Sequence, residues 1–284
     1  MASIKGVWII VSGNLNIRLG FIGAGNMGQA LIRGIVKSGT VLPDKIFVYD
    51  INREQTDLLK KDIGIIPLDN ESEVVSSCDV IVIAVKPNVV EKVLEKCKEA
   101  VDSKKIIVSI AVGIPISLFK RVLGNDIKVI RTMPNTPALV GEGITLISHD
   151  GNVDNEDIET VKALFNCVGK TEMLDEKLMC EVTALTSSSP AYVFMFIEAM
   201  ADAAVLSGLP RSLSYKLSAQ AVLGSAKMVL DTGKHPGELK DQVCSPAGTT
   251  IEAVKTLEKN GFRYAVIEAM NECTRRAREI NKNS

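Results

Sequence analysis

Short, continuous apolar runs alternate with amphipathic stretches through the first 170 residues. Runs without polar alternation are typical of strands covered on both faces, as in a parallel sheet. The runs lie at residues 17–22, 45–50, 79–85, 105–110 and 127–131. With helical patterns between them, they predict a right-handed, doubly wound α/β sheet, which a helix at about 154–166 and a short strand at 170–174 complete.

From residue 175 the pattern is helical almost to the end. We expect one long helix over 176–207, kinked near Ser189 because Pro190 removes a backbone donor inside it. Apolar stretches in this region cover more than one helical face and must be buried. Burial against a second copy of the chain is the favoured interpretation, and burial within one monomer is the alternative. Further helices are expected at about 211–231, 236–242, 249–259 and 262–281.

Length and composition exclude several classes of protein. At 284 residues the chain is long enough for two domains, and 33 basic and 34 acidic residues are well mixed, so no basic stripe is offered to nucleic acid. Six dispersed cysteines without a C-x-x-C pair suggest neither a metal site nor a disulfide framework, which fits a reduced, cytoplasmic compartment. The apolar run at residues 7–11 is too short to span a membrane, and we expect no other segment to do so.

A glycine motif follows the first predicted strand directly: Gly23-Ala24-Gly25-Asn26-Met27-Gly28, and a helix follows it. Strand, glycines and helix in this order form the dinucleotide fingerprint. Gly23 permits the tight turn, Gly25 lets the backbone approach a pyrophosphate, and Gly28 lets the helix pack closely on the strand. The alternative is a glycine turn that binds nothing.

Residues at the ends of the next strands bear on which coenzyme binds. Asp50 ends the second strand, where a carboxylate normally accepts hydrogen bonds from ribose hydroxyls and repels a 2′-phosphate. Arg53, however, suits adenine or that phosphate, so the choice stays open and leans to NAD. Asp50 is alternatively a cap for the following helix. Another strand ends in Ala84-Val85-Lys86-Pro87, which we expect to line the coenzyme crevice, although a solvated strand-end lysine is equally common.

The stretch from Val243 to Thr250 places small hydroxyl residues before a helix. Either Ser245 caps that helix or Thr249 and Glu252 form a capping box, and both leave backbone N–H groups beside hydroxyls at a positive helix end. Such an end binds a small carboxylate well, and an ordinary capped helix is the alternative. Three parts are therefore predicted: an N-terminal extension (1–16), a dinucleotide-binding domain (17–170) and a helical substrate-binding and dimerisation domain (171–284).

Two other features of the sequence bear on function. Residues 131–143 hold two prolines and two glycines, which predicts a rigid loop that serves either as a substrate wall or as a stiff connector. The only histidines, His149 and His235, lie in no constellation with a catalytic partner, so both are expected on the surface.

Taken together, these motifs resemble the pyrroline-5-carboxylate reductase family over nearly all of residues 17–280. The matching segments are Phe21 to Gly28, Ala84 to Pro87, Met133-Pro134-Asn135-Thr136-Pro137-Ala138 and Ser245-Pro246-Ala247-Gly248-Thr249-Thr250. The last two together are highly specific for the family. Two positions depart from it: Ser187-Ser188-Ser189 replaces the usual Gly-Ser-Gly, and Ala247 replaces a second glycine.

The resemblance implies an NAD(P)H-dependent reduction of 1-pyrroline-5-carboxylate to proline. It implies that Gly23 to Gly28, with Asn26 and Met27, and Ala84 to Lys86 contact the coenzyme. It also implies that Val243, Ser245, Gly248, Thr249 and Thr250 hold the substrate, with Thr250 near the ring nitrogen. Family members form dimers through the helical domain and often assemble further into decamers.

An imine carbon is already electrophilic, so this chemistry needs orientation and a held carboxylate more than a catalytic histidine. Thr250 is a poor acid at neutral pH and is expected to stabilise or relay a proton rather than donate one alone. A β-hydroxyacid dehydrogenase is the rival enzyme, but it needs a lysine well inside the first long helix, and Lys177 lies only at its start. A non-catalytic dinucleotide sensor is the rival from another class.

Overall fold

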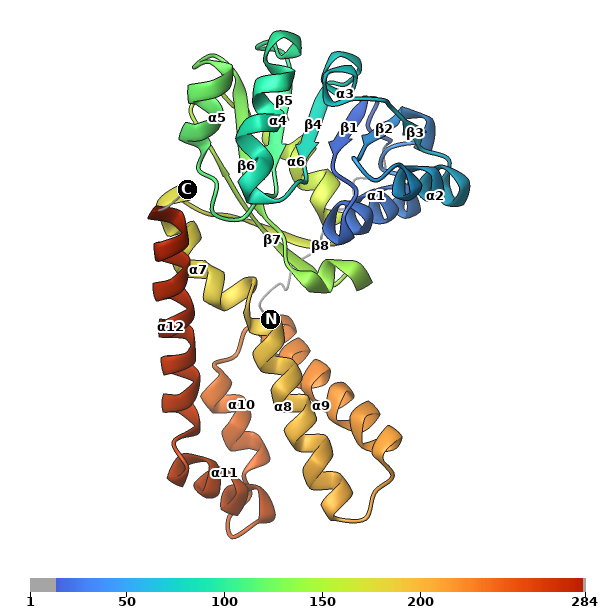
Figure 1. Ribbon diagram of the computed structural model, residues 1–284. Coiled ribbons are helices and arrows are strands. Elements are labelled where there is room, and N and C mark those ends of the chain that lie inside the picture. Colours follow the sequence, from blue (N-terminus) through green and yellow to red (C-terminus); the bar gives the residue numbers. More distant parts are fainter. Residues whose placement is uncertain (1–13, 283–284) are drawn as a thin grey trace, which may run out of the picture. The chain divides into compact units, whose positions relative to one another are not determined.

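The computed structural model describes residues 14–282, so most of the predicted N-terminal extension, residues 1–13, lies outside the described residues. The last part of that extension is tied to the fold: Leu15 packs against the core and its N–H donates to the Thr40 carbonyl over 2.7 Å. The chain divides into two compact units (Figure 1). The boundaries between them fall between Val182 and Thr183 and between Arg276 and Ala277. The sequence placed the boundary after residue 170, which lies inside a strand that the structure keeps whole.

The first unit is built on one eight-stranded sheet with the order β3-β2-β1-β4-β5-β6-β7-β8. Its strands are β1 (Leu19–Ile22), β2 (Ile46–Tyr49), β3 (Ile66–Pro67), β4 (Val80–Ile83), β5 (Ile106–Ser109), β6 (Lys128–Met133), β7 (Gly143–His149) and β8 (Gly169–Met173). The first six run parallel, so their carboxyl ends share one edge. This confirms the predicted doubly wound sheet.

The strand β7 runs antiparallel to β6. The alternation of apolar runs and helical patterns in the sequence did not predict this change of direction. Only a short 3₁₀ helix, η4 (Thr136–Val140), lies between the two strands. Parallel neighbours need a crossover of about a dozen residues or more, usually a helix, and a connection this short can only turn the chain back. The proline-rich loop therefore sets the strand direction.

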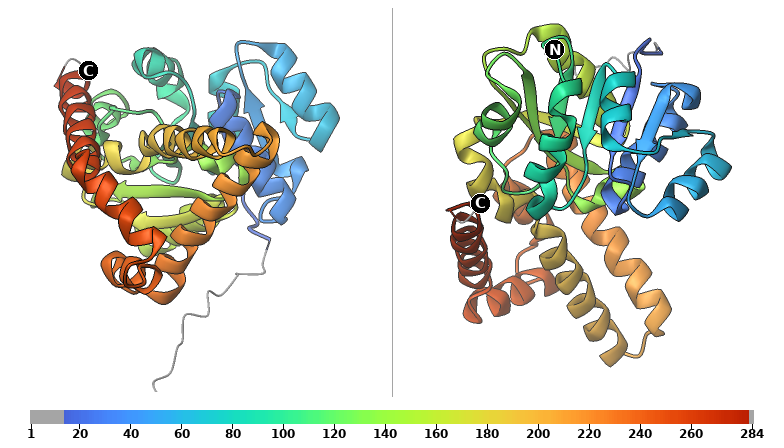
Figure 2. Two further views of the ribbon diagram at one scale, coloured as in Figure 1. Left: turned by 90° about the horizontal axis from the view of Figure 1, so that it is seen from below. Right: turned by 45° about the horizontal axis from the view of Figure 1, so that its top comes forward.

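Helices cover both faces of this sheet (Figures 1 and 2). On one face Leu31, Leu59 and Phe165 belong to one buried cluster, and on the other Val74, Leu94 and Phe119 belong to a second. The helices of the first face are α1 (Asn26–Ser38), α2 (Arg53–Ile63) and α6 (Asn155–Asn166). Those of the second are α3 (Glu71–Ser77), α4 (Val90–Cys97) and α5 (Ile116–Leu123).

The helical region begins differently from the prediction. The expected long helix over 176–207 is broken into a 3₁₀ turn, η5 (Glu176–Leu178), then α7 (Met179–Thr186) and α8 (Ser189–Leu206). Pro190 lies in the first turn of α8, where its missing N–H costs nothing, so the chain restarts a helix there instead of bending one. The remaining helices are α9 (Arg211–Thr232), α10 (Pro236–Val243), α11 (Thr249–Lys259) and α12 (Phe262–Lys282).

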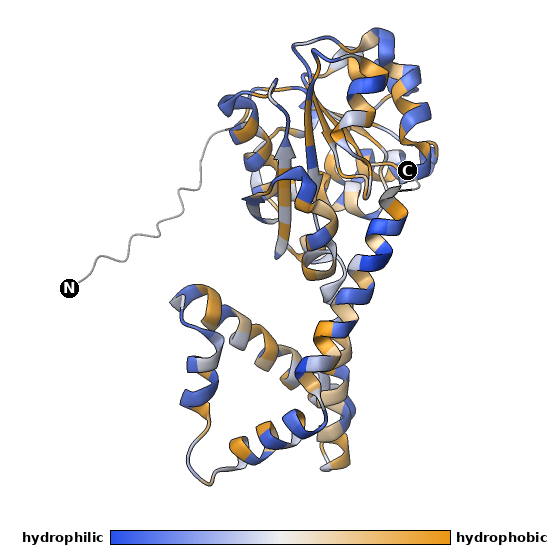
Figure 3. Cartoon of the chain, turned by 90° about the vertical axis from the view of Figure 1, so that its left-hand side faces the viewer, coloured by the Kyte–Doolittle hydropathy of each residue, from blue (hydrophilic) through white to orange (hydrophobic). Residues whose placement is uncertain are grey.

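Within the second unit, hydrophobic residues recur along the helices (Figure 3), and many of their side chains are exposed. Phe194, Met195 and Leu206 are 61%, 69% and 90% exposed. Among its hydrophobic residues that the structure describes, only Ala184 and Ala201 are buried. By length and composition, the stretch Glu176–Leu206 could also cross a membrane, so the expectation that no such segment exists was wrong. The second unit does not bury these faces by itself.

Candidate coenzyme and substrate sites

The glycine loop forms a close-fitting cradle at the carboxyl end of β1. Gly23 has φ +104°, and a Cβ there would lie 2.5 Å from the Ala84 carbonyl oxygen. A Cβ on Gly28 would lie 2.7 Å from the Gly23 oxygen, whereas one on Gly25 would meet nothing within 4 Å. Gly25 is exposed and caps α1 without any side-chain hydrogen bond. The loop thus packs tightly on the protein side and leaves room on the other, which fits a pyrophosphate at a helix N-terminus.

Asp50 braces this loop from the end of β2. Its Oδ2 accepts a 2.6 Å hydrogen bond from the N–H of Ala24, and its Oδ1 accepts one of 2.8 Å from the N–H of Asn52. Asn52 is the residue that caps α2, because its side chain accepts from the Glu54 N–H. The alternative role of Asp50 as a helix cap was therefore wrong.

Arg53 lies in the first turn of α2 and pairs with Asp69 at 2.7 Å. Both side chains are largely exposed, at 70% and 65%. Asp69 follows β3 and so lies at the same sheet edge as Asp50. Sequence reasoning missed Asp69. The available signal was an acidic residue two positions after Pro67, where β3 ends, and just before Asn70, which caps α3.

The segment after β4 joins the same edge. Its first residue, Ala84, donates its N–H to the Ile22 carbonyl over 2.8 Å and so lies against the glycine loop. Val85 is half-buried, and Lys86 and Pro87 are exposed. The structure thus brings together the predicted coenzyme residues from three adjacent strands.

The predicted substrate stretch forms a tight turn before α11. The N–H of Gly248 donates to the Ser245 carbonyl over 3.0 Å, with Pro246 and Ala247 between them. Ala247 has φ +54° and is the one described residue other than glycine with positive φ. Proline followed by a left-handed residue marks a type II turn, which normally carries glycine where Ala247 stands.

This turn changes how α11 is capped, although the helix covers the predicted range. The helix begins at Thr249 with Gly248 as its cap, and no side chain caps it, so both predicted arrangements of Ser245 and Thr249 were wrong. The first-turn N–H groups, those of Thr249 and Thr250 among them, have no partner within the helix. Val243 is 64% exposed, and Ser245 and Thr249 are also exposed. The stretch thus presents amides and hydroxyls to an anion.

Comparison with known proteins assigns the family. A model described as pyrroline-5-carboxylate reductase dimerisation matches residues 176–280, and one described as NADP oxidoreductase, coenzyme F420-dependent, matches residues 18–113. The pyrroline-5-carboxylate reductase of Escherichia coli is 49% identical over 266 residues, covering 94% of this chain and 99% of the relative. The chain belongs to the pyrroline-5-carboxylate reductase family. It is an oxidoreductase that uses NAD(P)H.

Solved structures agree with this assignment. The reductase of Plasmodium falciparum with NADP bound shares 36% identity and a TM-score of 0.85, over 95% of this chain and all of that one. That of Coxiella burnetii has a TM-score of 0.88 at 31% identity, over 93% and 98%. The predicted fold, a Rossmann-type sheet followed by a helical dimerisation domain, is thereby confirmed.

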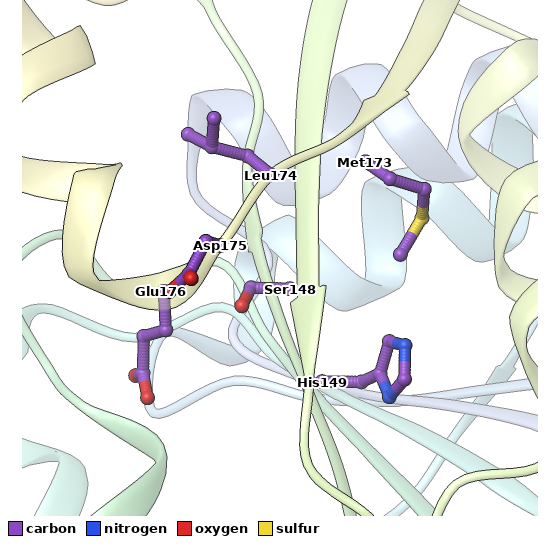
Figure 4. A pocket seen from close by; sticks show the side chains of 6 residues that line it. All are labelled: Ser148, His149, Met173, Leu174, Asp175 and Glu176. Atoms are coloured by element: carbon purple, nitrogen blue, oxygen red, sulfur yellow. The ribbon is translucent and has the colours of Figure 1, made fainter.

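Neither histidine of this reductase-family chain belongs to either site. His235 is exposed and caps α10, its Nδ1 accepting from the Gly237 N–H over 3.0 Å. His149 is half-buried and lines a hollow of about 490 Å³ (Figure 4). Its Nδ1 lies 2.8 Å from the Asp150 carbonyl oxygen. Figure 4 shows the imidazole beside Met173 and away from the Glu176 carboxylate. Across residues 14–282, no group of His, Cys, Asp and Glu side chains is arranged to hold a metal ion.

Around the proline-rich loop, side chains are engaged in structure. Arg131 has only 7% of its side chain exposed and pairs with Glu176 at 3.1 Å, while Glu176 also accepts from the Ile116 N–H over 2.7 Å. Asn135 accepts from the Ile144 N–H over 2.9 Å. These contacts fit a stiff connector, and the role of the loop as a substrate wall stays a prediction.

Proposed function

We propose that the chain reduces 1-pyrroline-5-carboxylate to L-proline with NAD(P)H, the last step of proline biosynthesis. The observation that carries this proposal is the turn before α11, where a helix without a side-chain cap presents amides beside three hydroxyls. A helix N-terminus favours a small carboxylate, and the substrate of the named relatives is a ring acid.

Each part of the site has a distinct task in this reaction. The amides of the α11 first turn, with Ser245 and Thr249, hold the substrate carboxylate and fix the ring. Thr250 places its hydroxyl at the ring nitrogen and stabilises it as the amine forms, since a threonine hydroxyl is too weak an acid to act alone. When bound, NAD(P)H supplies the hydride. Hydride adds to the electrophilic imine carbon, and a proton from solvent water, relayed through the Thr250 hydroxyl, adds to the ring nitrogen, so no catalytic base is required.

The coenzyme is assigned to the first unit. Its pyrophosphate lies over Gly25 and the N-terminus of α1, with Asn26 and Met27 beside it. Asp50 and Arg53 face the adenosine ribose. The segment from Ala84 to Pro87 continues the crevice towards the nicotinamide.

The uncovered helices support a proposal for the assembly. We propose a homodimer formed through the helical unit, with further association into decamers, working in the cytoplasm without a membrane or nucleic-acid partner. In this assembly the apolar surface of Glu176–Leu206 faces a second subunit rather than lipid.

The test is the oxidation of NADH and NADPH by the purified chain with pyrroline carboxylate as acceptor. Thr250→Val should lower kcat by at least tenfold while coenzyme affinity stays unchanged, since one hydrogen bond to a developing charge is lost. Thr256→Val is the matched control in the same helix, because the Thr256 hydroxyl only donates to the Glu252 carbonyl.

Unchanged turnover in Thr250→Val would remove that residue from the mechanism. Coenzyme binding without imine-dependent oxidation would instead support the dinucleotide sensor.

A further inference from the structure

The charges around the coenzyme's ribose edge are strongly unbalanced. Residues 50–54 and 69–73 lie at the ends of β2 and β3, and together they carry five carboxylates and one guanidinium. The Lys96 ammonium pairs with one of these carboxylates, that of Glu71, at 2.8 Å, which leaves four. The guanidinium is that of Arg53, which is held at 2.7 Å by Asp69. A 2′-phosphate adds about two negative charges at neutral pH and here meets a negative field, with the only nearby guanidinium already paired.

Asp50 and Asp69 contribute to this field in different ways. Asp50 has both carboxylate oxygens on backbone N–H groups, so it is fixed in place and also shapes the glycine loop. Asp69 accepts no bond from that loop, and its side chain contacts Arg53. Asp69 can therefore affect selectivity without shaping the cradle.

We propose that Asp69 is a specificity-determining residue that, with Asp50, makes this chain prefer NADH over NADPH. Asp69 is a positioning residue: it acts by holding Arg53 in an ion pair and withholding it from a 2′-phosphate. This inference rests on the proposed function and specifies which coenzyme, NADH rather than NADPH, supplies the hydride.

Coenzyme dissociation constants measured by calorimetry on the native assembly, without imine, test the proposal. The wild-type chain should bind NADH at least tenfold more tightly than NADPH. Asp69→Asn should strengthen NADPH binding by about three- to tenfold and leave NADH binding unchanged, because one exposed unit charge a few ångströms away has an effect of that order. The gain should shrink as salt is raised.

A matched control separates this role from plain loss of charge. Glu73 lies four residues further on, and its carboxylate accepts from the Asp69 N–H and the Asn70 side chain rather than contacting Arg53. Glu73→Gln removes the same unit charge and should change the NADPH to NADH ratio much less than Asp69→Asn does. In an Arg53→Ala background, Asp69→Asn should have lost most of its effect, since the two residues then no longer act as a pair.

The outcomes are distinguishable. Tighter binding of NADPH by the wild-type chain, or an undiminished effect of Asp69→Asn in the absence of Arg53, overturns this inference and leaves the proposed function intact. Failure to bind either coenzyme overturns both.

Discussion

The left-handed conformation of Ala247 makes a prediction of unusual sign: replacing it with glycine should stabilise the protein. An L-residue with φ +54° carries strain of roughly 1–2 kcal/mol relative to glycine. Glycine loses roughly 0.5–1 kcal/mol more backbone entropy on folding, which offsets part of the gain. The net expectation for Ala247→Gly is a stabilisation of about 0.5–1 kcal/mol.

The same substitution nearby provides the control. Ala253 is exposed in the interior of α11, where the backbone is right-handed, so Ala253→Gly should destabilise by about 1 kcal/mol. Thermal unfolding at one fixed protein concentration should show the melting temperature rising by about 1–3 °C for Ala247→Gly and falling by about 2–4 °C for Ala253→Gly. If both variants lower it equally, Ala247 is not strained.

Substrate binding should weaken in Ala247→Gly although the fold becomes more stable. The strained turn fixes the path from Ser245 into the first turn of α11, and glycine at position 247 loosens that path. We expect Ala247→Gly to raise the KM for the imine several-fold with little change in kcat, because it weakens preorganisation rather than removing a contact. An unchanged KM would show that the strain serves no binding purpose.

Three further predictions concern the first unit. Gly25→Ala should keep the wild-type melting temperature, because its Cβ meets no protein atom within 4 Å, yet weaken coenzyme binding measurably by calorimetry; normal affinity would contradict the proposed pyrophosphate position. Glu176→Ala should lower the free energy of unfolding in urea by roughly 2–4 kcal/mol, because it leaves the buried Arg131 guanidinium without this carboxylate. A loss under about 1 kcal/mol would show that other groups compensate for the missing charge. Burial raises the pKa of the Cys78 and Cys97 thiols to about 12, so both should resist a thiol reagent from about pH 7 to 9 until the chain is unfolded; rapid labelling of the folded chain would refute this.

Features set by local sequence were predictable. The glycine loop was recognisable because the steric reason for each glycine lies within one turn of the chain. A Cβ on Gly23 or Gly28 would indeed collide with backbone atoms. Helices α9 to α12 were placed within a few residues because local signals mark their ends, such as Gly-Leu-Pro before α9 and His-Pro at the start of α10. Sequence pattern and three-dimensional structure agree where the residues of a segment favour a single local conformation.

Features set by a single backbone dihedral angle or by a distant partner were not. The helix α11 begins where the sequence predicted, but its cap was wrong: the left-handed Ala247 leaves Gly248 at the cap position, and alanine gives no sign of that conformation. The kink expected near Ser189 is a break because Pro190 begins a new helix. Asp69 was missed because its role depends on Arg53, 16 residues earlier in the chain, and only the sheet brings the two together.

The two units achieve stability by different routes. The first buries two large clusters against its own sheet and is complete as a single chain. The second has, among its described hydrophobic residues, only Ala184 and Ala201 buried, which is far too little apolar area to offset the entropy of ordering its helices. Its stability must come from association with another copy, as the dimerisation family model implies. The turn before α11 lies in this unit, so if it holds the substrate as we propose, substrate binding should depend on assembly.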